Sequence, residues 1–462
     1  MTAPEHYQAV VIGSGQGGTP LCQALAGAGM RTALVERQHV GGTCVNEGCT
    51  PTKTMVASGR VAYLARRGAD YGVHTGDIRV DMQRVRQRKR AIVDLFRNGS
   101  QKRIEKTANL ELIFAQASFT GAQSLLLRLN DGSQRAITAD RIFINAGARP
   151  GAPKLDGIAG VPYLDSTSIM EIDSLPEHLL VIGGGYIGLE FGQLFRRLGS
   201  RVTIVQSAAQ LLRGEDTDVT AEIANIFEQD GVEILFNAKA ERVAKTGAEI
   251  RLTLRVQNES RNLAGSHLLM ATGRVPNTDT LNIAAAGIAA DSRGFIKVNE
   301  RLETNVDGVY ALGDIKGGPA FTHISYDDFR ILRTNVIEKG KASIKDRLVP
   351  YTLFIDPQLG RIGITEAEAR AQNRKIRVAK MPMSYVARAL EVDETRGFMK
   401  AIVDAETGQI LGAAVLGIEG GEIMAMLQIA MMGRLPFTTL REGTFAHPTL
   451  AESLNNLFTH FQ

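Results

Sequence analysis

One pattern occurs twice in this chain: an apolar segment, a glycine-rich turn, a helix-like segment and a second apolar segment. The first copy is YQAVVIGSGQGGTPLCQALAGAGMRTALVER (7–37), and the second is HLLVIGGGYIGLEFGQLFRRLGSRVTIVQ (178–206). Each turn carries G-x-G-x-x-G, at Gly13, Gly15 and Gly18 and again at Gly183, Gly185 and Gly188. These glycines permit a tight turn and the close approach of a pyrophosphate, which the N-terminus of the helix attracts. The repeat therefore predicts two Rossmann-like dinucleotide-binding domains, with electrons passing from one cofactor to the other.

The residue that ends each copy indicates which nucleotide that copy binds. Glu36 ends the first copy, where a carboxylate can accept hydrogen bonds from both ribose hydroxyls. The second copy ends in uncharged Gln206, with Arg201 and Arg213 nearby in the sequence. A carboxylate would repel a 2′-phosphate, whereas Gln would not. The second site therefore favours NADPH, and NADH stays an alternative because no arginine occupies the key position itself.

Length and composition indicate a multidomain globular protein. The 462 residues exceed what one core needs, and 44% hydrophobic with 22% charged residues is an ordinary balance. The net charge is only +4, so the basic run RVRQRKRAIVDLFR (84–97) is interpreted as the solvated face of a helix rather than a nucleic-acid site. Three cysteines, an N-terminus unlike a signal peptide and no uninterrupted apolar run of about 18 residues predict a cytoplasmic protein.

Later segments predict further parts of the fold. In TNVDGVYALGDIKG (304–317), Asp314 follows an apolar strand and could reach a ribityl chain or pyrophosphate. The alternation in RGFMKAIVDAETGQILGAAVLG (396–417) predicts an antiparallel hairpin that turns at AETGQ. A helix is expected over EIMAMLQIAMMGR (422–434), and its methionines are interpreted as core or subunit interface.

The segment GGTCVNEGCTPTKTMVAS (41–58) holds two of the three cysteines, Cys44 and Cys49. A zinc site is a poor fit because no second Cys pair completes four ligands, and a staple over so short a loop would remove little chain entropy. A helix beginning near Pro51 would place Cys49 at its N-terminus, where the helix dipole and the charge of Lys53 favour a thiolate. The surroundings therefore favour a redox pair, and no metal site is predicted. No role is assigned to Cys22.

Five motifs carry a resemblance to a known family. GGTCVNEGCTPTK, GGGYIGLE, ATGRVPNT, ALGD and HPTLAE occur in the order seen in flavoprotein disulfide reductases, which include dihydrolipoyl dehydrogenase, glutathione reductase and mercuric reductase. The resemblance covers essentially the whole chain and implies an α/β fold that binds FAD in the first glycine-loop domain and NAD(P)H in the second. A C-terminal α+β domain would pair two subunits. The implied boundaries are 1–150 for the first part of the FAD domain, 151–275 for the NAD(P)H domain, 276–344 for the second FAD or central part, and 345–462 for the dimerisation domain.

The resemblance also assigns roles to matching residues. Cys49 is expected as the flavin-facing thiolate and Cys44 as the interchange thiol that attacks the substrate. Lys53 would lie near flavin N5 and pair with Glu190. Tyr186 lies one helical turn before Glu190, so the two share a face and could form a gate where the nicotinamide enters.

His447 is expected to be the acid–base residue, with Glu452 holding its tautomer. In the family this histidine reaches the interchange thiol of the other subunit, so the active unit would be a homodimer. The expected FAD contacts are Gly13, Gly15, Gly18, Glu36, Gly42, Thr43, Lys53, Gly147, Gly313 and Asp314. The expected NAD(P)H contacts are Gly183, Gly185, Gly188, Gln206, Arg213 and Gly273.

The branch of the family depends on finer features. HPTLAE (447–452) is typical of dihydrolipoyl dehydrogenase, but an acid normally stands in place of Gln206, and MSYVARALEVDETRGFMK (383–400) is more similar to mercuric reductase. A C-terminal vicinal cysteine pair and an N-terminal metal-binding domain, both expected in a mercuric reductase, are missing, which disfavours mercury reduction.

FTHISYDDFRI (321–331) and FAHPTLAESLNNLF (445–458) resemble the reactive-chlorine-resistance oxidoreductases, a branch with members that reduce hypothiocyanous acid. The predicted substrate is therefore a small oxidant of this type. Lipoamide or another small disulfide, and a metal ion, stay as alternatives. A slow regulatory or complex-bound flavoprotein is the alternative of another class, and the complete Cys–Cys–His–Glu set argues against it.

Overall fold

The computed structural model describes residues 4–257 and 259–462, and the chain divides into two units. The first unit comprises Met1–Thr54, Arg84–Ala152 and Gly273–Arg347. The second comprises Met55–Gln83, Pro153–Thr272 and Leu348–Gln462. Each unit is formed by segments far apart in the sequence, so each glycine loop lies in a different unit.

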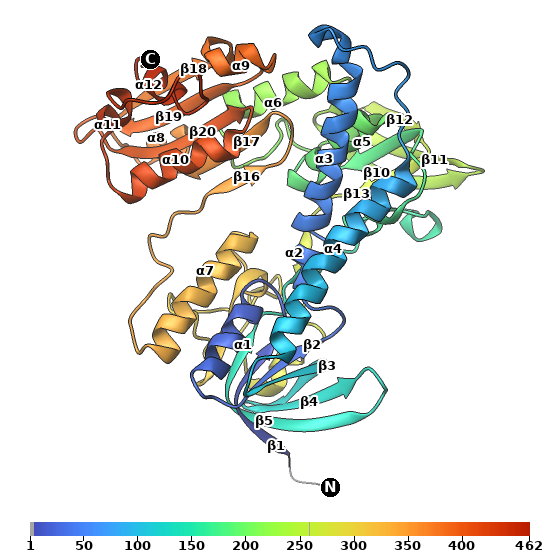
Figure 1. Cartoon of the computed structure of the whole chain (residues 1–462). Helices are drawn as coiled ribbons and strands as arrows, with labels where there is room; N and C mark the ends of the chain where they lie inside the picture. The colour runs from blue at the N-terminus through green and yellow to red at the C-terminus, as the bar shows by residue number, and fades with distance from the viewer. Residues whose placement is uncertain (1–3, 258) are drawn as a thin grey trace. The chain divides into compact units, whose positions relative to one another are not determined.

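The first unit is built on a six-stranded sheet (Figure 1). Its strands are β1 (Glu5–Ile12), β2 (Thr32–Glu36), β3 (Leu110–Gly121), β4 (Ser124–Leu129), β5 (Gln134–Ile144) and β15 (Val309–Ala311). β1 pairs in parallel with β2 and β5, and β15 pairs in parallel with β5, whereas β4 is antiparallel to both of its neighbours. The loops that follow β1, β5 and β15 therefore meet at the carboxyl edge of one sheet, where dinucleotides bind.

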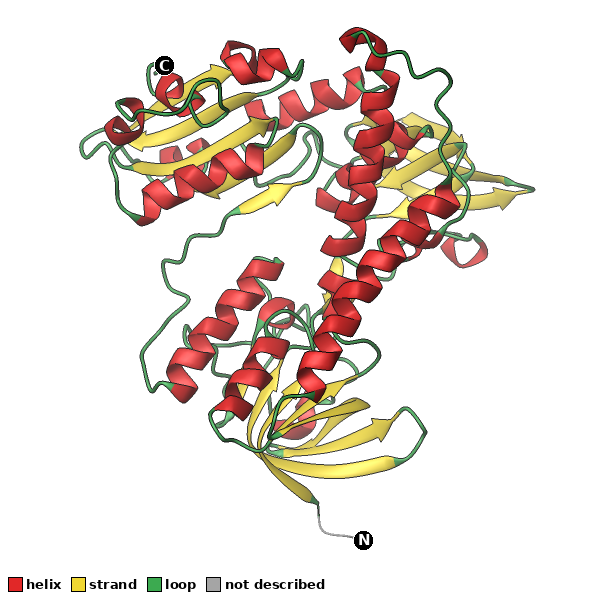
Figure 2. Ribbon diagram, in the orientation of Figure 1, coloured by secondary structure: helices red, strands yellow, loops and turns green. Residues whose placement is uncertain are grey.

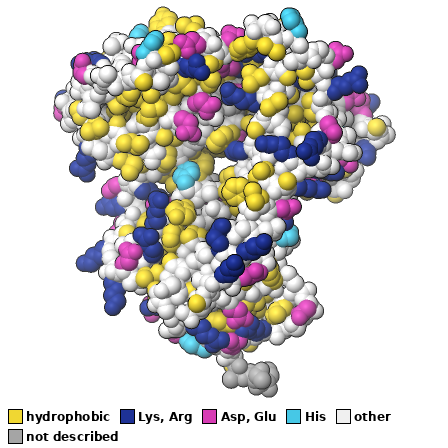
Figure 3. All heavy atoms as spheres, viewed as in Figure 1, with side chains coloured by type: hydrophobic (Ala, Val, Ile, Leu, Met, Phe, Trp, Pro, Cys, Tyr) yellow, Lys and Arg dark blue, Asp and Glu magenta, His cyan; other side chains and the backbone are white. Residues whose placement is uncertain are grey.

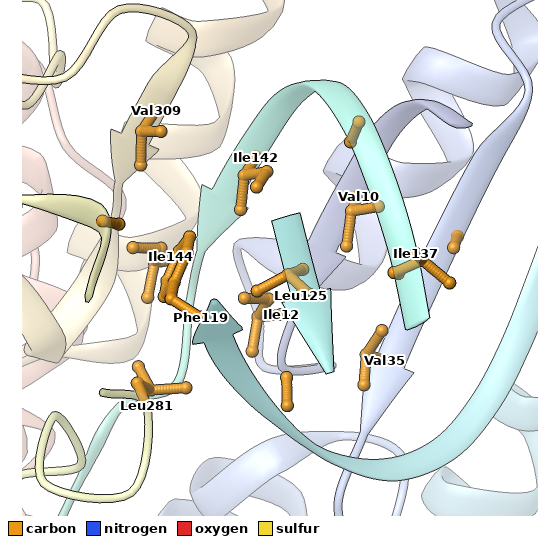
Figure 4. Packing of buried hydrophobic residues seen from close by; sticks show 14 of the residues in the cluster. Val10, Ile12, Val35, Phe119, Leu125, Ile137, Ile142, Ile144, Leu281 and Val309 are labelled. Atoms are coloured by element: carbon orange, nitrogen blue, oxygen red, sulfur yellow. The ribbon is translucent and has the colours of Figure 1, made fainter. Parts of the chain in front are cut away.

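Apolar side chains cover both faces of this sheet. Successive side chains of β1 point into two different hydrophobic clusters, one on each face. Val10 and Ile12 lie with Val35 and Phe119 in one cluster (Figure 4). Ala9 and Val11 face the other way, toward α1 (Gly18–Gly27) and α7 (Thr322–Leu332), which contact each other on that side of the sheet. Continuous burial on both faces explains why the strand reads as an unbroken apolar run.

The remaining helices of this part of the chain follow the second strand. α2 (Gly42–Asn46) and α3 (Cys49–Arg66) carry the cysteine segment, and α4 (Met82–Glu105) carries the basic run. A two-stranded ladder joins β6 (Ala148–Pro150) to β14 (Arg274–Pro276). Arg84, Arg88 and Arg90 are exposed, as a solvated helix face predicts, but Lys89 is buried, so the basic run is not uniformly solvated. Lys and Arg side chains are scattered among acidic and apolar ones on the visible face (Figure 3).

The second unit contains the second glycine loop in a four-stranded parallel sheet. Its strands in spatial order are β13 (His267–Met270), β7 (His178–Ile182), β8 (Arg201–Val205) and β9 (Glu233–Leu235). α5 (Tyr186–Leu198) connects β7 to β8, and α6 (Thr217–Gln229) leads to β9. An antiparallel sheet of β10 (Ala238–Thr246), β11 (Glu249–Val256) and β12 (Glu259–Gly265) follows.

The C-terminal part of this unit is a five-stranded antiparallel sheet. Its spatial order is β16 (Tyr351–Leu353), β17 (Gln358–Gly363), β20 (Ile410–Gly417), β19 (Phe398–Asp404) and β18 (Ile376–Pro382). The predicted hairpin is the β19–β20 pair. α10 (Gly420–Met432) packs on β17 and β20 (Figure 2). The short helices are α8 (Glu366–Ala371), α9 (Ala387–Glu391), α11 (Phe437–Arg441) and α12 (Ser453–Leu457).

The methionines of α10 divide between its two faces. Met424 lies in the core of the C-terminal sheet, as one of the two predicted roles requires. Ile429 and Met432 lie on the opposite face and are 68% and 67% exposed. The predicted α/β fold class, with two glycine-loop units and a C-terminal α+β part, is confirmed. Within the described residues, no helix combines the length and apolar character needed to cross a membrane.

Candidate active site

The cysteine segment places two thiols close together at the start of a helix. Cys49 is the first residue of α3, two residues earlier than the sequence predicts, and Cys44 lies in the preceding short helix α2. The two side chains are hydrogen bonded to each other. The hydroxyl of Thr322, at the first residue of α7, lies 3.3 Å from the Cys49 sulfur. Cys44 is half-buried, whereas Cys49 is exposed.

The environment makes the two thiols unequal. The hydrogen bond to Cys49, burial and the charge of Cys49 raise the pKa of Cys44 far above its ordinary value, against the opposing effects of Thr322 and Lys53. A negative charge on the pair therefore resides on Cys49 before Cys44. A helix N-terminus favours a thiolate at that position. Burial raises the pKa of Cys22 to about 12, against the opposing effect of backbone hydrogen bonds.

The first glycine loop and the cysteine segment are packed directly on each other. Gly42 has φ +60°, and a Cβ there would lie 2.7 Å from the Cα of Gly15. The amide of Gly41 donates to the carbonyl of Ser14 at 3.2 Å. No side chain fits at Gly42 without displacing the loop, so the backbone holds Thr43 and Cys44 close to the expected cofactor loop.

The strand-end carboxylate of the first unit is fixed by the same loop. Glu36 Oε2 accepts from the amide of Ser14 at 3.0 Å and from its hydroxyl at 2.6 Å. The amide of Gly18 donates to Asn145 Oδ1 at 2.9 Å, while Asn145 Nδ2 donates to the carbonyl of Leu312 at 2.9 Å. Asn145 therefore ties the loops after β1, β5 and β15 together.

A second carboxylate of this unit lies beside a small pocket. Asp314 follows β15, and burial raises its pKa while Arg274 and Lys316 oppose that rise. Asp314 shares the pocket with Arg274, Arg293 and Phe295. The preceding residue, Gly313, has φ +73°, and a Cβ there would lie 2.6 Å from Ser325 Oγ.

These groups fit FAD. The glycine loop at the N-terminus of α1 suits a pyrophosphate, because its first turn contains no acidic residue. Glu36 at the end of β2 suits a ribose, and Asp314 offers a further carboxylate at the same sheet edge. Gly147, also in the left-handed region at φ +68°, has open space around it.

The second glycine loop also has the geometry of a dinucleotide site. A Cβ at Gly188 would lie 1.9 Å from the carbonyl oxygen of Gly183, so α5 packs against the turn as closely as glycine permits. A Cβ at Gly185 would meet no heavy atom within 4 Å, which leaves this side of the loop open. Gly273 has φ +126° and comparable open space.

Gln206 is hydrogen bonded within its own loop. Of the two arginines nearby in the sequence, Arg201 lies far from Gln206 in the structure. Gln206 Oε1 accepts from the amide of Gly184 at 3.2 Å, and Nε2 donates to the carbonyl of Gln210 at 2.7 Å. Arg213 is exposed on the same loop. Arg201 begins β8 whereas Gln206 follows its other end, so about 15 Å of strand separates them. Of the two arginines near Gln206 in the sequence, Arg201 therefore lies away from the strand end that Gln206 occupies.

Tyr186 and Glu190 lie one turn apart on α5, as the sequence predicts. The Tyr186 ring packs edge-on against Tyr351, with centroids 5.5 Å apart and planes at 88°. Glu190 is buried, and its Oε1 accepts from the amide of Phe354 at 2.9 Å. Lys53 belongs to the other unit, so its pairing with Glu190 stays a prediction.

His447 and Glu452 form the hydrogen bond expected of an acid–base pair. Nδ1 of His447 lies 2.9 Å from Oε2 and 3.1 Å from Oε1 of Glu452. The imidazole is 68% exposed. A carboxylate on Nδ1 leaves Nε2 as the nitrogen that can exchange a proton with a substrate. The catalytic role of His447 stays a prediction.

Two of these groups were not predicted. Thr322 lies 273 positions from Cys49, and Asn145 lies 127 positions from Gly18. Thr322 lies in the FTHISYDDFRI segment, and Asn145 directly follows an apolar strand. These two sequence features were the signals that could have pointed to the two residues. In the parts of the chain that the structure describes, no three His, Cys, Asp or Glu side chains are grouped as a metal site would require.

Comparison with known proteins bears on the whole chain. The sequence profile of the pyridine nucleotide-disulphide oxidoreductases matches residues 7–328, and that of their dimerisation domain matches residues 349–458. The chain is 40% identical to the probable pyridine nucleotide-disulfide oxidoreductase RclA of Escherichia coli K12, over 98% of this chain and 99% of that protein. It is 33% identical to a mercuric reductase of Bacillus cereus, over 97% of this chain and 70% of that protein.

Solved structures agree with these matches. The HOCl-induced flavoprotein disulfide reductase RclA of Escherichia coli superposes with a TM-score of 0.90 and 38% identity, covering 98% of this chain and 99% of that chain. Its Cu(II) complex superposes with a TM-score of 0.91 at the same identity and coverage.

Proposed function

The chain belongs to the pyridine nucleotide-disulphide oxidoreductase family, and on that premise we propose that its electron acceptor is a small sulfur-centred oxidant such as hypothiocyanous acid. The chain is an FAD-dependent enzyme that uses NAD(P)H to reduce a sulfur group. Its C-terminal dimerisation domain pairs it into a homodimer. When bound, FAD accepts a hydride from NAD(P)H and supplies two electrons to a disulfide.

The Cys44–Cys49 pair is the observation that carries the proposal. The two thiols are unequal, because the hydrogen bond to Cys49, burial and the charge of Cys49 raise the pKa of Cys44. We assign Cys49 to the flavin-facing position and Cys44 to the substrate. Lys53, Tyr186 and Glu190 would complete the flavin and nicotinamide side of the site.

Reduction of hypothiocyanous acid by this pair balances in two steps. The Cys44 thiol gives its proton to His447 of the partner subunit as its sulfur attacks the electrophilic sulfur of the oxidant. An S–S bond forms, the S–O bond breaks, and the hydroxyl leaves as water with that proton from His447 of the partner subunit. The Cys49 thiolate then attacks the Cys44 sulfur and expels thiocyanate, which leaves the Cys44–Cys49 disulfide. The dithiol loses two electrons and the oxidant gains two, so each turnover consumes one NAD(P)H.

The likeness to RclA supports an oxidant rather than a large disulfide as acceptor. That relative, which is 38% identical to this chain, is described as HOCl-induced, so it responds to a reactive chlorine species. The Cu(II) complex of the same relative makes a metal ion the second candidate acceptor. Lipoamide is the third.

For the nucleotide we propose a preference for NADPH. Gln206 puts no charge at the strand end, and Arg213 offers an exposed guanidinium on the same loop. A 2′-phosphate meets no carboxylate at the Gln206 position, whereas Glu36 occupies the corresponding position of the first unit.

The test is turnover of the purified holoenzyme with NADPH or NADH against four acceptors: hypothiocyanous acid, lipoamide, Cu(II) and Hg(II). We expect the highest kcat/KM with NADPH and hypothiocyanous acid, with one nucleotide consumed per oxidant. A higher kcat/KM with lipoamide would identify a dihydrolipoyl dehydrogenase instead. A higher value with either metal ion would establish the second candidate.

A further inference from the structure

A row of five paired residues crosses the C-terminal sheet, and three of them are cationic. Strand register pairs Tyr351 with Arg361, Arg361 with Ala414, Ala414 with Lys400, and Lys400 with Lys380. Directly paired residues point to the same face of a sheet, so all five side chains lie in one line on one face. Within the same unit, this row meets the acidic segment EDTD (215–218) at the start of α6.

The two lysines of this row form close ion pairs with acidic side chains. Lys400 lies 3.2 Å from Asp216, 3.1 Å from Asp218 and 2.8 Å from Glu366. Lys380 lies 2.7 Å from Asp218. Buried charges of this kind are tolerated when hydrogen bonds satisfy them.

The pair at the Tyr351 end of the row is different. Arg361 Nε and Glu215 Oε2 are 3.5 Å apart, and both side chains are only 3% exposed. Neither Glu215 Oε2 nor the two terminal nitrogens of Arg361 has a hydrogen-bond partner within the described chain. Buried charged atoms without a hydrogen bond disfavour folding, so these three atoms call for a reason other than stability.

The unsatisfied pair lies next to the aromatic contact of Tyr186. Tyr351 is the strand neighbour of Arg361, and its ring packs on Tyr186. Burial and the charge of Glu215 raise the pKa of Tyr186 to about 12, while the charge of Arg361 acts in the opposite direction. Glu215 and Arg361 are therefore both within electrostatic reach of the Tyr186 hydroxyl.

The same loop links this pair to the strand end of the nucleotide site. Gln206 donates to the carbonyl of Gln210, and Gln210 Nε2 donates to the carbonyl of Glu215 at 3.3 Å. The loop thus connects the expected ribose position at Gln206 with the charges beside Tyr186.

We propose that Glu215 and Arg361 are positioning residues for Tyr186, and that ionisation of Glu215 weakens the binding of the nicotinamide nucleotide. The inference rests on the proposed role of Tyr186 at the nicotinamide site. Ionised Glu215 attracts Arg361, which holds Tyr351 and Tyr186 in their packed arrangement, so the nucleotide must displace a more firmly held ring. The added negative charge also repels the anionic nucleotide, in the same direction.

The surroundings of Glu215 place its ionisation near neutral pH. Burial raises its pKa to about 7, against the attraction of Arg361 from β17 and Lys400 from β19. Asp216 beside it and Glu368 on α8 add to the rise. Glu215 is therefore mostly neutral at about pH 6 and mostly ionised at about pH 8.

The test measures flavin reduction by NADPH in an anaerobic stopped-flow instrument, with holoenzyme at about pH 6 and about pH 8. In the wild type the apparent Kd for NADPH should rise about fivefold with pH, the lower end of typical coupling between linked equilibria. Glu215→Gln should show the low value at both pH values. Glu366→Gln is the matched control, because it removes a carboxylate that pairs with Lys400 of the same row. This variant should keep the wild-type rise of Kd with pH.

Retention of the wild-type pH dependence in Glu215→Gln would overturn the inference. If that variant loses FAD, Tyr351→Leu is the second test. It removes the ring between Arg361 and Tyr186 but keeps the charge of Glu215, so it should reduce the rise of Kd with pH; an unchanged rise in Tyr351→Leu would likewise overturn the inference. Tyr186→Ala tests the premise, because an unchanged Kd would refute its place at the nicotinamide site. The assay contains no acceptor, so its outcome is separate from the identity of the oxidant.

Discussion

Replacing Thr322 with valine tests how the protein keeps the reduced cysteine pair ionised. Valine has the same shape but no hydroxyl, and the Thr322 hydroxyl lies 3.3 Å from the Cys49 sulfur. A thiolate can only accept, so the hydroxyl must donate to it when the pair is charged. A hydrogen bond to a charged group contributes roughly 1.5–3 kcal/mol, and the exposure of Cys49 argues for the lower end.

A loss of about 1.4 kcal/mol corresponds to about one pH unit, so Thr322→Val should raise the pH midpoint of first ionisation of the pair by about one unit. The assay is the pH dependence of alkylation by iodoacetamide after anaerobic reduction, supported by the long-wavelength charge-transfer absorbance. Thr322→Ser keeps the donor and is the control, with a midpoint close to the wild type. An unchanged midpoint in Thr322→Val, with FAD retained, would refute the idea that Thr322 stabilises the thiolate.

Three further substitutions probe other parts of the site. Gly42→Ala should release FAD and lower stability by more than Gly29→Ala. Both glycines have positive φ, where a side chain costs about 1–2 kcal/mol, but only a Cβ at Gly42 would meet backbone atoms within 4 Å. FAD absorbance and thermal unfolding measure this, and equal losses would contradict it. Gln206→Glu should lower the ratio of kcat/KM for NADPH over NADH by about tenfold, a difference of about 1.4 kcal/mol, through repulsion of the 2′-phosphate; an unchanged ratio would remove Gln206 as a determinant. Glu452→Gln should lower kcat about tenfold with hypothiocyanous acid by weakening the tether of His447, while leaving flavin reduction by NADPH unchanged; loss of both steps would indicate a structural role instead.

Local patterns in the sequence were enough to predict the parts of the site that lie close together in the chain. The two glycine loops, the helix at Cys49 and the Glu452 contact of His447 each involve residues within about one turn or one loop, where spacing determines geometry. The hairpin over 396–417 was equally readable from its alternation and turn.

Contacts between distant segments were not predictable in this way. Thr322 approaches Cys49 and Asn145 joins three loops only because strands from separate segments enter one sheet. Glu215 and Arg361 meet only after the C-terminal sheet packs on the loop before α6. Arg201 is near Gln206 in the sequence, but the length of β8 puts the two residues at opposite ends of the strand.

The central claim is that Cys44 and Cys49 carry the electrons to a small sulfur oxidant. Its most direct test is steady-state NADPH oxidation with hypothiocyanous acid by wild type, Cys44→Ser and Cys22→Ser, each with FAD content measured. We predict that Cys44→Ser retains FAD but loses turnover by at least about 100-fold, since covalent catalysis fails without its nucleophile. Cys22→Ser removes a buried thiol outside the pair and should turn over like the wild type. Turnover by Cys44→Ser at the wild-type rate would contradict the account.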